Sequence, residues 1–103
     1  MTFALATADE ILCALGQRLK AQRLAQALPQ SDLAQMAGLS LGALRKLENS
    51  GQCSLETLVR TVQALGLAHE LDTVFALQRQ SIAQMLQAEA VTSRQRAPRR
   101  GRS

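Results

Sequence analysis

Residues 30–49 read QSDLAQMAGLSLGALRKLEN, and this stretch decides the fold. Two short helices packed at a steep angle need a small side chain where they nearly touch, and Ala34 supplies one. The tight turn between them needs a residue that tolerates positive φ, which is Gly38, and Ser40 is a natural N-cap for the second helix. The apolar residues placed to anchor both helices are Leu33, Ala37, Leu39, Leu44 and Leu47.

Another helix is predicted before this stretch, over about residues 8–28. Thr7 followed by Glu10 is a capping-box signature, and leucines recur behind it at roughly helical spacing. Gly16 lies inside this helix, where glycine costs about 1 kcal/mol relative to alanine, so we expect another helix to approach closely there. Pro29 then interrupts the helix and suits the start of the next one.

Two more helices are predicted after the stretch, which makes five in all. The fourth, over residues 55–65, is capped by Ser54 and ends at Gly66. The fifth begins near Ala68 and carries Phe75. One apolar stripe is expected along the fourth helix, formed by Leu55, Leu58, Val59, Val62 and Leu65.

The remaining sequence predicts a sixth helix, or an extension of the fifth, and then a disordered tail. We therefore expect a domain over residues 1–77, a C-terminal helix over 78–93 and a basic tail over 94–103. The tail is rich in Arg, Pro, Gly and Ser and cannot bury enough surface to fold alone. One face of the C-terminal helix would carry Ile82, Met85 and Leu86.

Composition and charge agree with an all-α protein and limit its chemistry. Ala, Leu and Gln dominate, and these are helix formers, while only Phe3 and Phe75 are aromatic. The formal charge is +4, but the tail contributes +5 and leaves −1 for residues 1–93. Any attraction of the folded part to nucleic acid must therefore come from where its charges are placed.

Several classes of function are not expected. Cys13 and Cys53 lie far apart without a CxxC pattern or a nearby histidine, so we expect buried or half-buried thiols rather than a metal or redox site. His69 stands alone beside a helix start, where a surface or capping role is expected. No catalytic set, cofactor motif, membrane span or secretory signal is recognisable, so a non-enzymatic cytoplasmic protein is expected.

A longer pattern combines these features in one register. It consists of Leu15-Gly16, Leu19-Lys20, Arg23, Gln30, Leu33-Ala34, Ala37-Gly38-Leu39-Ser40, Leu44 and Leu47-Glu48-Asn49. With these residues the chain from about Leu15 to Leu67 resembles the Xre, or phage-repressor-type, helix-turn-helix family. The resemblance implies a five-helix domain that binds double-stranded DNA, with the second helix of the motif in the major groove.

The resemblance also assigns DNA contacts. Gln30 would bind a phosphate through its side chain and the helix-terminal amides, and Ser40 and Asn49 match other phosphate contacts of the family. The outward reading positions are Leu41, Gly42, Arg45 and Lys46. Arg23 and Glu48 match a partly buried ion pair that is structural rather than catalytic.

This chain departs from the family pattern at the reading positions. Leu41 and Gly42 cannot make bidentate hydrogen bonds, although Leu41 could pack on a thymine methyl and Gly42 allows close approach. Direct readout would then depend on Arg45 and Lys46 pairing with guanine, at about 1–3 kcal/mol of discrimination each. A solvated charged face is the alternative for both. Pro29 replaces the usual capping Thr or Ser, a loss of roughly 1 kcal/mol.

The partners are left open by the sequence. Such proteins usually bind DNA as homodimers, and the apolar residues from Phe75 onward could form the dimer surface or cap the monomer's own core. The tail could lie on DNA, fold on a protein partner or only improve solubility. The layout is similar to antitoxins of Hip-type modules, which bind a kinase-fold toxin, whereas a plain autonomous repressor and a protein–protein adaptor are the competing hypotheses. A DNA-binding protein of this kind is expected to be nucleoid-associated.

Overall fold

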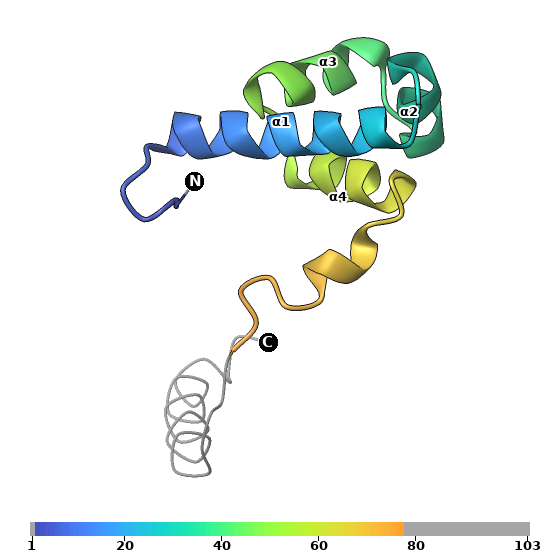
Figure 1. Ribbon diagram of the computed structural model, residues 1–103. Helices are drawn as coiled ribbons and strands as arrows, with labels where there is room; N and C mark the ends of the chain where they lie inside the picture. Colours follow the sequence, from blue (N-terminus) through green and yellow to red (C-terminus); the bar gives the residue numbers. More distant parts are fainter. Residues whose placement is uncertain (1, 78–103) are drawn as a thin grey trace, which may run out of the picture. The chain divides into compact units, whose positions relative to one another are not determined.

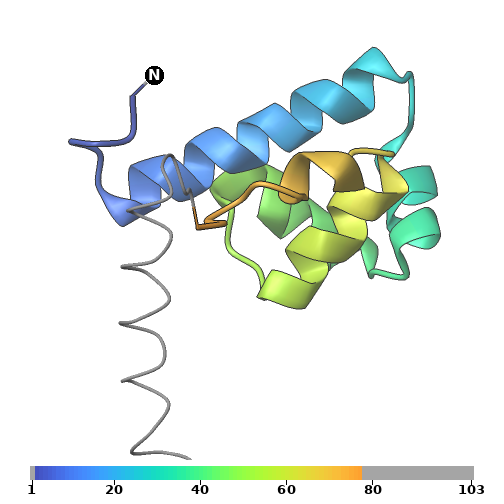
Figure 2. The same ribbon diagram turned by 90° about the horizontal axis from the view of Figure 1, so that it is seen from below.

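The structure, a computed structural model, describes residues 2–77, and all regular secondary structure within that range is helical. Four α-helices are followed by one short 3₁₀ helix, labelled η1. Their bounds are α1 (Ala8–Ala25), α2 (Gln30–Ala37), α3 (Leu41–Ser50), α4 (Leu55–Ala64) and η1 (Ala68–Leu71). The longest helix, α1, packs mainly on α3, whereas α2 contacts both α3 and α4 (Figures 1 and 2).

The predicted starts of the first four helices are confirmed. Thr7 and Glu10 form a complete capping box, with the Thr7 amide donating to Glu10 Oε1 at 2.8 Å and the Glu10 amide to Thr7 Oγ1 at 3.1 Å. The Ser40 and Ser54 hydroxyls each accept a backbone amide at the third position of their helices. Pro29 gives α2 no side-chain cap, so the expected loss of that interaction is also observed.

The helix ends show why α1 is shorter than predicted. Gly38 adopts the predicted left-handed conformation, with φ 69°, and ends α2. Ala27 adopts the same conformation, with φ 55°, and the Leu28 amide bonds back to the Arg23 carbonyl. This is a Schellman ending. The helix therefore ends at Ala25 rather than near residue 28, because the reversal occurs before Pro29 is reached.

The core lies where α2, α3 and α4 meet. Its buried members are Leu33, Ala34, Leu44, Leu47 and Leu65, and Leu19, Leu28, Ala64 and Leu67 pack against them. Ala37 is buried as predicted, but Leu39 is only half-buried. The predicted stripe on α4 is too long, because Leu55 in the first turn is 75% exposed.

The expected close approach at Gly16 is confirmed. A Cβ atom at Gly16 would collide with the Leu47 carbonyl oxygen, and one at Gly51 would collide with the backbone of Leu12. Two glycines thus allow α1 to lie directly against the C-terminal end of α3. The backbone contact fixes where the first helix crosses the third.

The predicted fifth α-helix is wrong, since η1 spans only Ala68–Leu71. No side chain caps its start at Leu67, and the β-branched pair Thr73–Val74 follows at once. Phe75 then has a positive φ of 57°, which no α-helix accommodates. The chain divides into two compact units at this point, Met1–Asp72 and Thr73–Ser103.

The predicted C-terminal helix over 78–93 and the basic tail over 94–103 lie outside the described residues. Among the helices that are described, none has the length and apolar character needed to cross a membrane.

Candidate nucleic-acid interface

Helix α3 has one face in the core and the other open to solvent. Leu44, Leu47 and Glu48 are buried, whereas Arg45 and Lys46 are exposed. This division follows from the 3.6-residue period, which alternates inward and outward positions every one or two residues.

The first turn of α3 offers little polar chemistry. Leu41 is half-buried, and Gly42 is exposed with open space around the position of a side chain. Ser40 uses its hydroxyl oxygen to accept the Ala43 amide at 3.0 Å, so its family-implied phosphate contact would have to come from the hydroxyl proton. Asn49 is exposed and makes no side-chain hydrogen bond to residues 2–77.

Arg45 and Lys46 point to different neighbours. The Arg45 Nε atom lies 3.5 Å from Gln30 Oε1, on the side of α2. Lys46 lies beside a shallow hollow formed with the chain that leads into α4. The residues that line it are Ala43, Lys46, Gln52, Cys53, Ser54 and Thr57. The two cations therefore flank α3 rather than forming one cluster.

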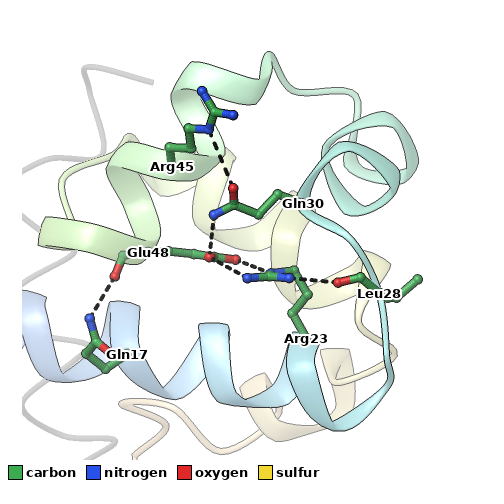
Figure 3. A network of polar contacts seen from close by, with 6 residues as sticks. All are labelled: Gln17, Arg23, Leu28, Gln30, Arg45 and Glu48. Atoms are coloured by element: carbon green, nitrogen blue, oxygen red, sulfur yellow. Dashed lines mark hydrogen bonds and ion pairs between the residues drawn. The ribbon is translucent and has the colours of Figure 1, made fainter.

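Behind this surface, Arg23 of α1 and Glu48 of α3 form the ion pair that the resemblance implies (Figure 3). Arg23 Nε donates to Glu48 Oε2 at 2.7 Å and Nη2 to Oε1 at 3.1 Å, and Nη1 donates to the Leu28 carbonyl at 2.7 Å. The side chains are 7% and 1% exposed. The pair joins α1, the reversal after it and α3.

The ionisation of Glu48 is set by two opposing effects. Burial raises its pKa. Hydrogen bonds from Arg23 and Gln30 and the positive charges of Arg23 and Lys20 together lower the pKa by more than burial raises it, so the pKa lies below the usual glutamate value. Glu48 therefore stays a carboxylate and acts only as a hydrogen-bond acceptor.

Sequence reasoning missed how Gln30 is held. Its Nε2 donates to Glu48 Oε1 at 2.9 Å, and its Oε1 faces Arg45 (Figure 3). Gln17 of α1 was missed too, and its Nε2 donates to the Glu48 carbonyl oxygen at 3.2 Å. For Gln30 the available signal was that a buried carboxylate has more acceptor positions than one arginine fills, whereas Gln17 bonds to the Glu48 backbone and had no such signal.

The positive charge on α3 comes from Arg45 and Lys46 and does not reflect an overall positive charge of residues 2–77. Residues 2–77 hold six Lys and Arg side chains against seven Asp and Glu, a net charge of −1. Arg23 is paired with Glu48, and Arg60 is paired with Glu56 at 2.7 Å. Within the same range, Arg45 and Lys46 take part in no ion pair. They are therefore able to pair with anionic or acceptor groups of a ligand.

The expectation of buried cysteines is wrong, because Cys13 and Cys53 are both exposed free thiols. In the part of the chain that is described, no three His, Cys, Asp or Glu side chains gather as a metal site would require.

In a comparison with protein-family models, the chain matches the family described as helix-turn-helix over residues 19–71. The matched region is just over half of the 103-residue chain and contains α2, α3 and α4 with their connecting turns. The search of curated proteins found no match.

Proposed function

The chain belongs to the helix-turn-helix family of the Xre, phage-repressor type, and from this premise we propose that it is a sequence-specific transcriptional repressor. In the proposal α3 enters the major groove of operator DNA while α2 spans the backbone. Members of the family are DNA-binding regulators, which supports the general assignment.

One observation supports the proposal most directly. Arg45 and Lys46 lie on the exposed face of a helix whose other face is buried, and neither forms an ion pair within residues 2–77. A polyanion that presents acceptors in a groove suits them.

The proposed contacts divide into two kinds. Base readout is assigned to Arg45 and Lys46, with Leu41 packing on a thymine methyl and Gly42 admitting the helix close to the bases. Phosphate contacts, which position the protein without reading sequence, are assigned to Ser40 and Asn49, and the family resemblance alone adds Gln30 to them. Arg23 and Glu48 keep a structural role.

We assign the active form to a homodimer, because one such motif reads only a half-site and half-sites lie about 34 Å apart. The apolar residues from Phe75 through the segment 78–93 are the proposed dimer surface. The basic tail, residues 94–103, is proposed as an arm for DNA or for a protein partner. A role as an autoregulating antitoxin that binds a kinase-fold toxin is the more specific form of this proposal, and it is supported by the sequence layout alone.

Selection of binding sites from random duplex DNA with the purified full chain tests the proposal. We expect a pseudo-palindrome with guanine in each half-site, and loss of selective binding in Arg45→Ala and Lys46→Ala. Arg18→Ala, which removes one exposed charge from α1, is the matched control and should keep the selection. A protein–protein adaptor would select no sequence and would keep its partner when both cations are replaced.

A further inference from the structure

Four side chains form a continuous series from the interior to the surface of α3 (Figure 3). Arg23 donates to Glu48 at 2.7 Å, Gln30 donates to the same carboxylate at 2.9 Å, and Arg45 approaches Gln30 at 3.5 Å. The residues come from α1, α3 and α2, so the series crosses all three helices that frame the proposed reading surface. Only Arg45 is at the exposed end.

The orientation of the Gln30 amide is determined by Glu48. A carboxylate only accepts hydrogen bonds, so the NH₂ group of Gln30 must face inward. Its carbonyl oxygen then faces outward, toward a group that can only donate, and the guanidinium of Arg45 is such a group. An exposed glutamine without Glu48 could present either end of its amide.

The contact with Gln30 also decides which part of Arg45 is free. An arginine has one Nε–H and two terminal NH₂ groups, and Gln30 takes the Nε–H. The two terminal nitrogens remain, and these form the end-on fork that matches guanine O6 and N7. At 3.5 Å the contact is long for a hydrogen bond, so it biases the direction of a mobile side chain rather than fixing it.

We propose that Gln30 is a positioning residue for Arg45, through which the buried Arg23–Glu48 pair sets the direction of the base-reading arginine. The inference rests on the proposed function and deepens it, because it assigns guanine preference to a residue that touches no base. Holding Arg45 in its bound direction before DNA arrives reduces the conformational entropy that binding removes. The resemblance to the family implies a different role for Gln30, as a phosphate contact.

The test is a double-mutant cycle on the selected operator. Affinities of the wild type, Gln30→Met, Arg45→Ala and the double variant are measured for the operator and for a copy with the preferred guanine replaced by adenine. Methionine keeps the length of glutamine but neither orients on Glu48 nor accepts from Arg45. We expect Gln30→Met to lower the guanine preference by about fivefold, within the range of one bidentate contact. The double variant should lose no more preference than Arg45→Ala alone, because the two residues act as one unit.

The guanine preference separates the positioning role from the phosphate role, because glutamine is neutral and its loss leaves the salt slope unchanged in either role. If Gln30 positions Arg45, the preference falls, whereas the loss of a phosphate contact weakens binding to both DNAs equally. A Gln30→Met protein that keeps the full guanine preference and only binds more weakly to both DNAs would overturn the inference and favour a phosphate contact. Gln22→Met, an exposed glutamine of α1, is the control and should behave as the wild type. A wild type without any sequence preference would instead overturn the proposed function.

A second measurement does not depend on the folding of any variant. In the free wild type, the Arg45 Nε–H should exchange with water more slowly than the Nε–H of Arg18, whose guanidinium lies over the Phe3 ring, 4.9 Å from its centroid, but donates to no acceptor within residues 2–77. Equal exchange rates of the two groups in an NMR experiment would overturn the inference.

Discussion

At the scale of single residues, Glu48 shows how one buried charge determines both stability and surface chemistry. It is 1% exposed, so its charge is stabilised by Arg23, Gln30 and Lys20 rather than by water. Arg23 in turn is satisfied by Glu48 and by the Leu28 carbonyl. Among the described residues, no buried side-chain nitrogen or oxygen lacks a hydrogen-bond partner, so removing any member leaves a partner without compensation.

Replacing Glu48 with alanine should therefore strongly destabilise the protein. Arg23 would remain charged and buried without its partner, a change that costs about 3–5 kcal/mol of unfolding free energy. Urea unfolding monitored by circular dichroism measures the effect. Glu56→Ala is the matched control, because it removes the exposed pair with Arg60, which contributes about 0–1 kcal/mol. Equal losses in the two variants would contradict the importance of the buried pair.

The low pKa of Glu48 predicts an acid-sensitive fold. Because the pKa is lower in the folded than in the unfolded state, the unfolded chain binds this proton more readily. The stabilisation of the folded state by the ionised Glu48 carboxylate is complete above the ordinary glutamate pKa. It decreases as the pH falls from there toward the lower pKa of Glu48 in the folded state. Unfolding free energies of the wild type and Glu48→Gln between pH 7 and pH 3 should converge as the pH falls. A constant difference would show that Glu48 does not titrate differently in the two states.

At the scale of helices, the predictable features are those encoded within a few residues. The caps at Thr7, Ser40 and Ser54 were predicted because a side-chain oxygen satisfies amides only three positions away. The same reasoning failed at Ala27, because alanine gives no signal of a left-handed conformation that the following contacts impose. It also failed after Gly66, where apolar spacing predicted a helix without a capping residue to start it.

Ala27 is a position where the sequence conflicts with the backbone. A left-handed alanine costs the folded state about 1–2 kcal/mol, and replacing it with glycine removes this strain. Glycine also increases the entropy of the unfolded chain, which offsets part of the gain in stability. Ala27→Gly should thus stabilise the protein by about 0.5–1 kcal/mol. Thermal unfolding should show a higher midpoint for this variant.

Gly66→Ala provides the opposite control for that measurement. Gly66 has φ 77° and open space where a Cβ would lie, so alanine there introduces only the backbone strain. The two substitutions should shift the midpoint in opposite directions. A lower midpoint for Ala27→Gly would mean that the left-handed turn at the end of α1 is not retained in solution.

At the scale of the whole molecule, the candidate site illustrates the limit of reading positions one at a time. The resemblance gave Gln30, Arg45 and Glu48 three separate roles, namely a phosphate contact, base readout and a structural ion pair. The fold brings the three side chains into one hydrogen-bonded series. Gln30 is 15 positions from Arg45 and 18 from Glu48, and these residues meet only because α2 packs on α3. That information is tertiary, so no local spacing rule contains it.

Charge is also divided unevenly along the chain, and this division predicts how the protein binds DNA. Residues 2–77 carry a net charge of −1, while residues 94–103 carry five arginines and no acid. In the proposed function, residues 2–77 discriminate between sequences through Arg45 and Lys46 but, with this net charge, supply little general attraction to a polyanion. In the same proposal, the arginines of the tail supply the sequence-independent attraction to DNA. Each phosphate that they neutralise adds about −0.9 to the slope of log affinity against log salt concentration.

Replacing the five tail arginines with glutamine in the full chain should separate these two contributions. The variant should bind its operator more weakly at low salt and show a shallower salt slope, by up to about 4.5 if every arginine contacts a phosphate. Its preference for the operator over a guanine-substituted copy should stay unchanged, because the reading helix is untouched. Arg45→Ala should give the reverse result, with a lost preference and a slope changed by about 1 or less. If the tail variant lost the preference as well, the tail would have to contribute to sequence recognition itself, and discrimination could no longer be assigned to α3 alone.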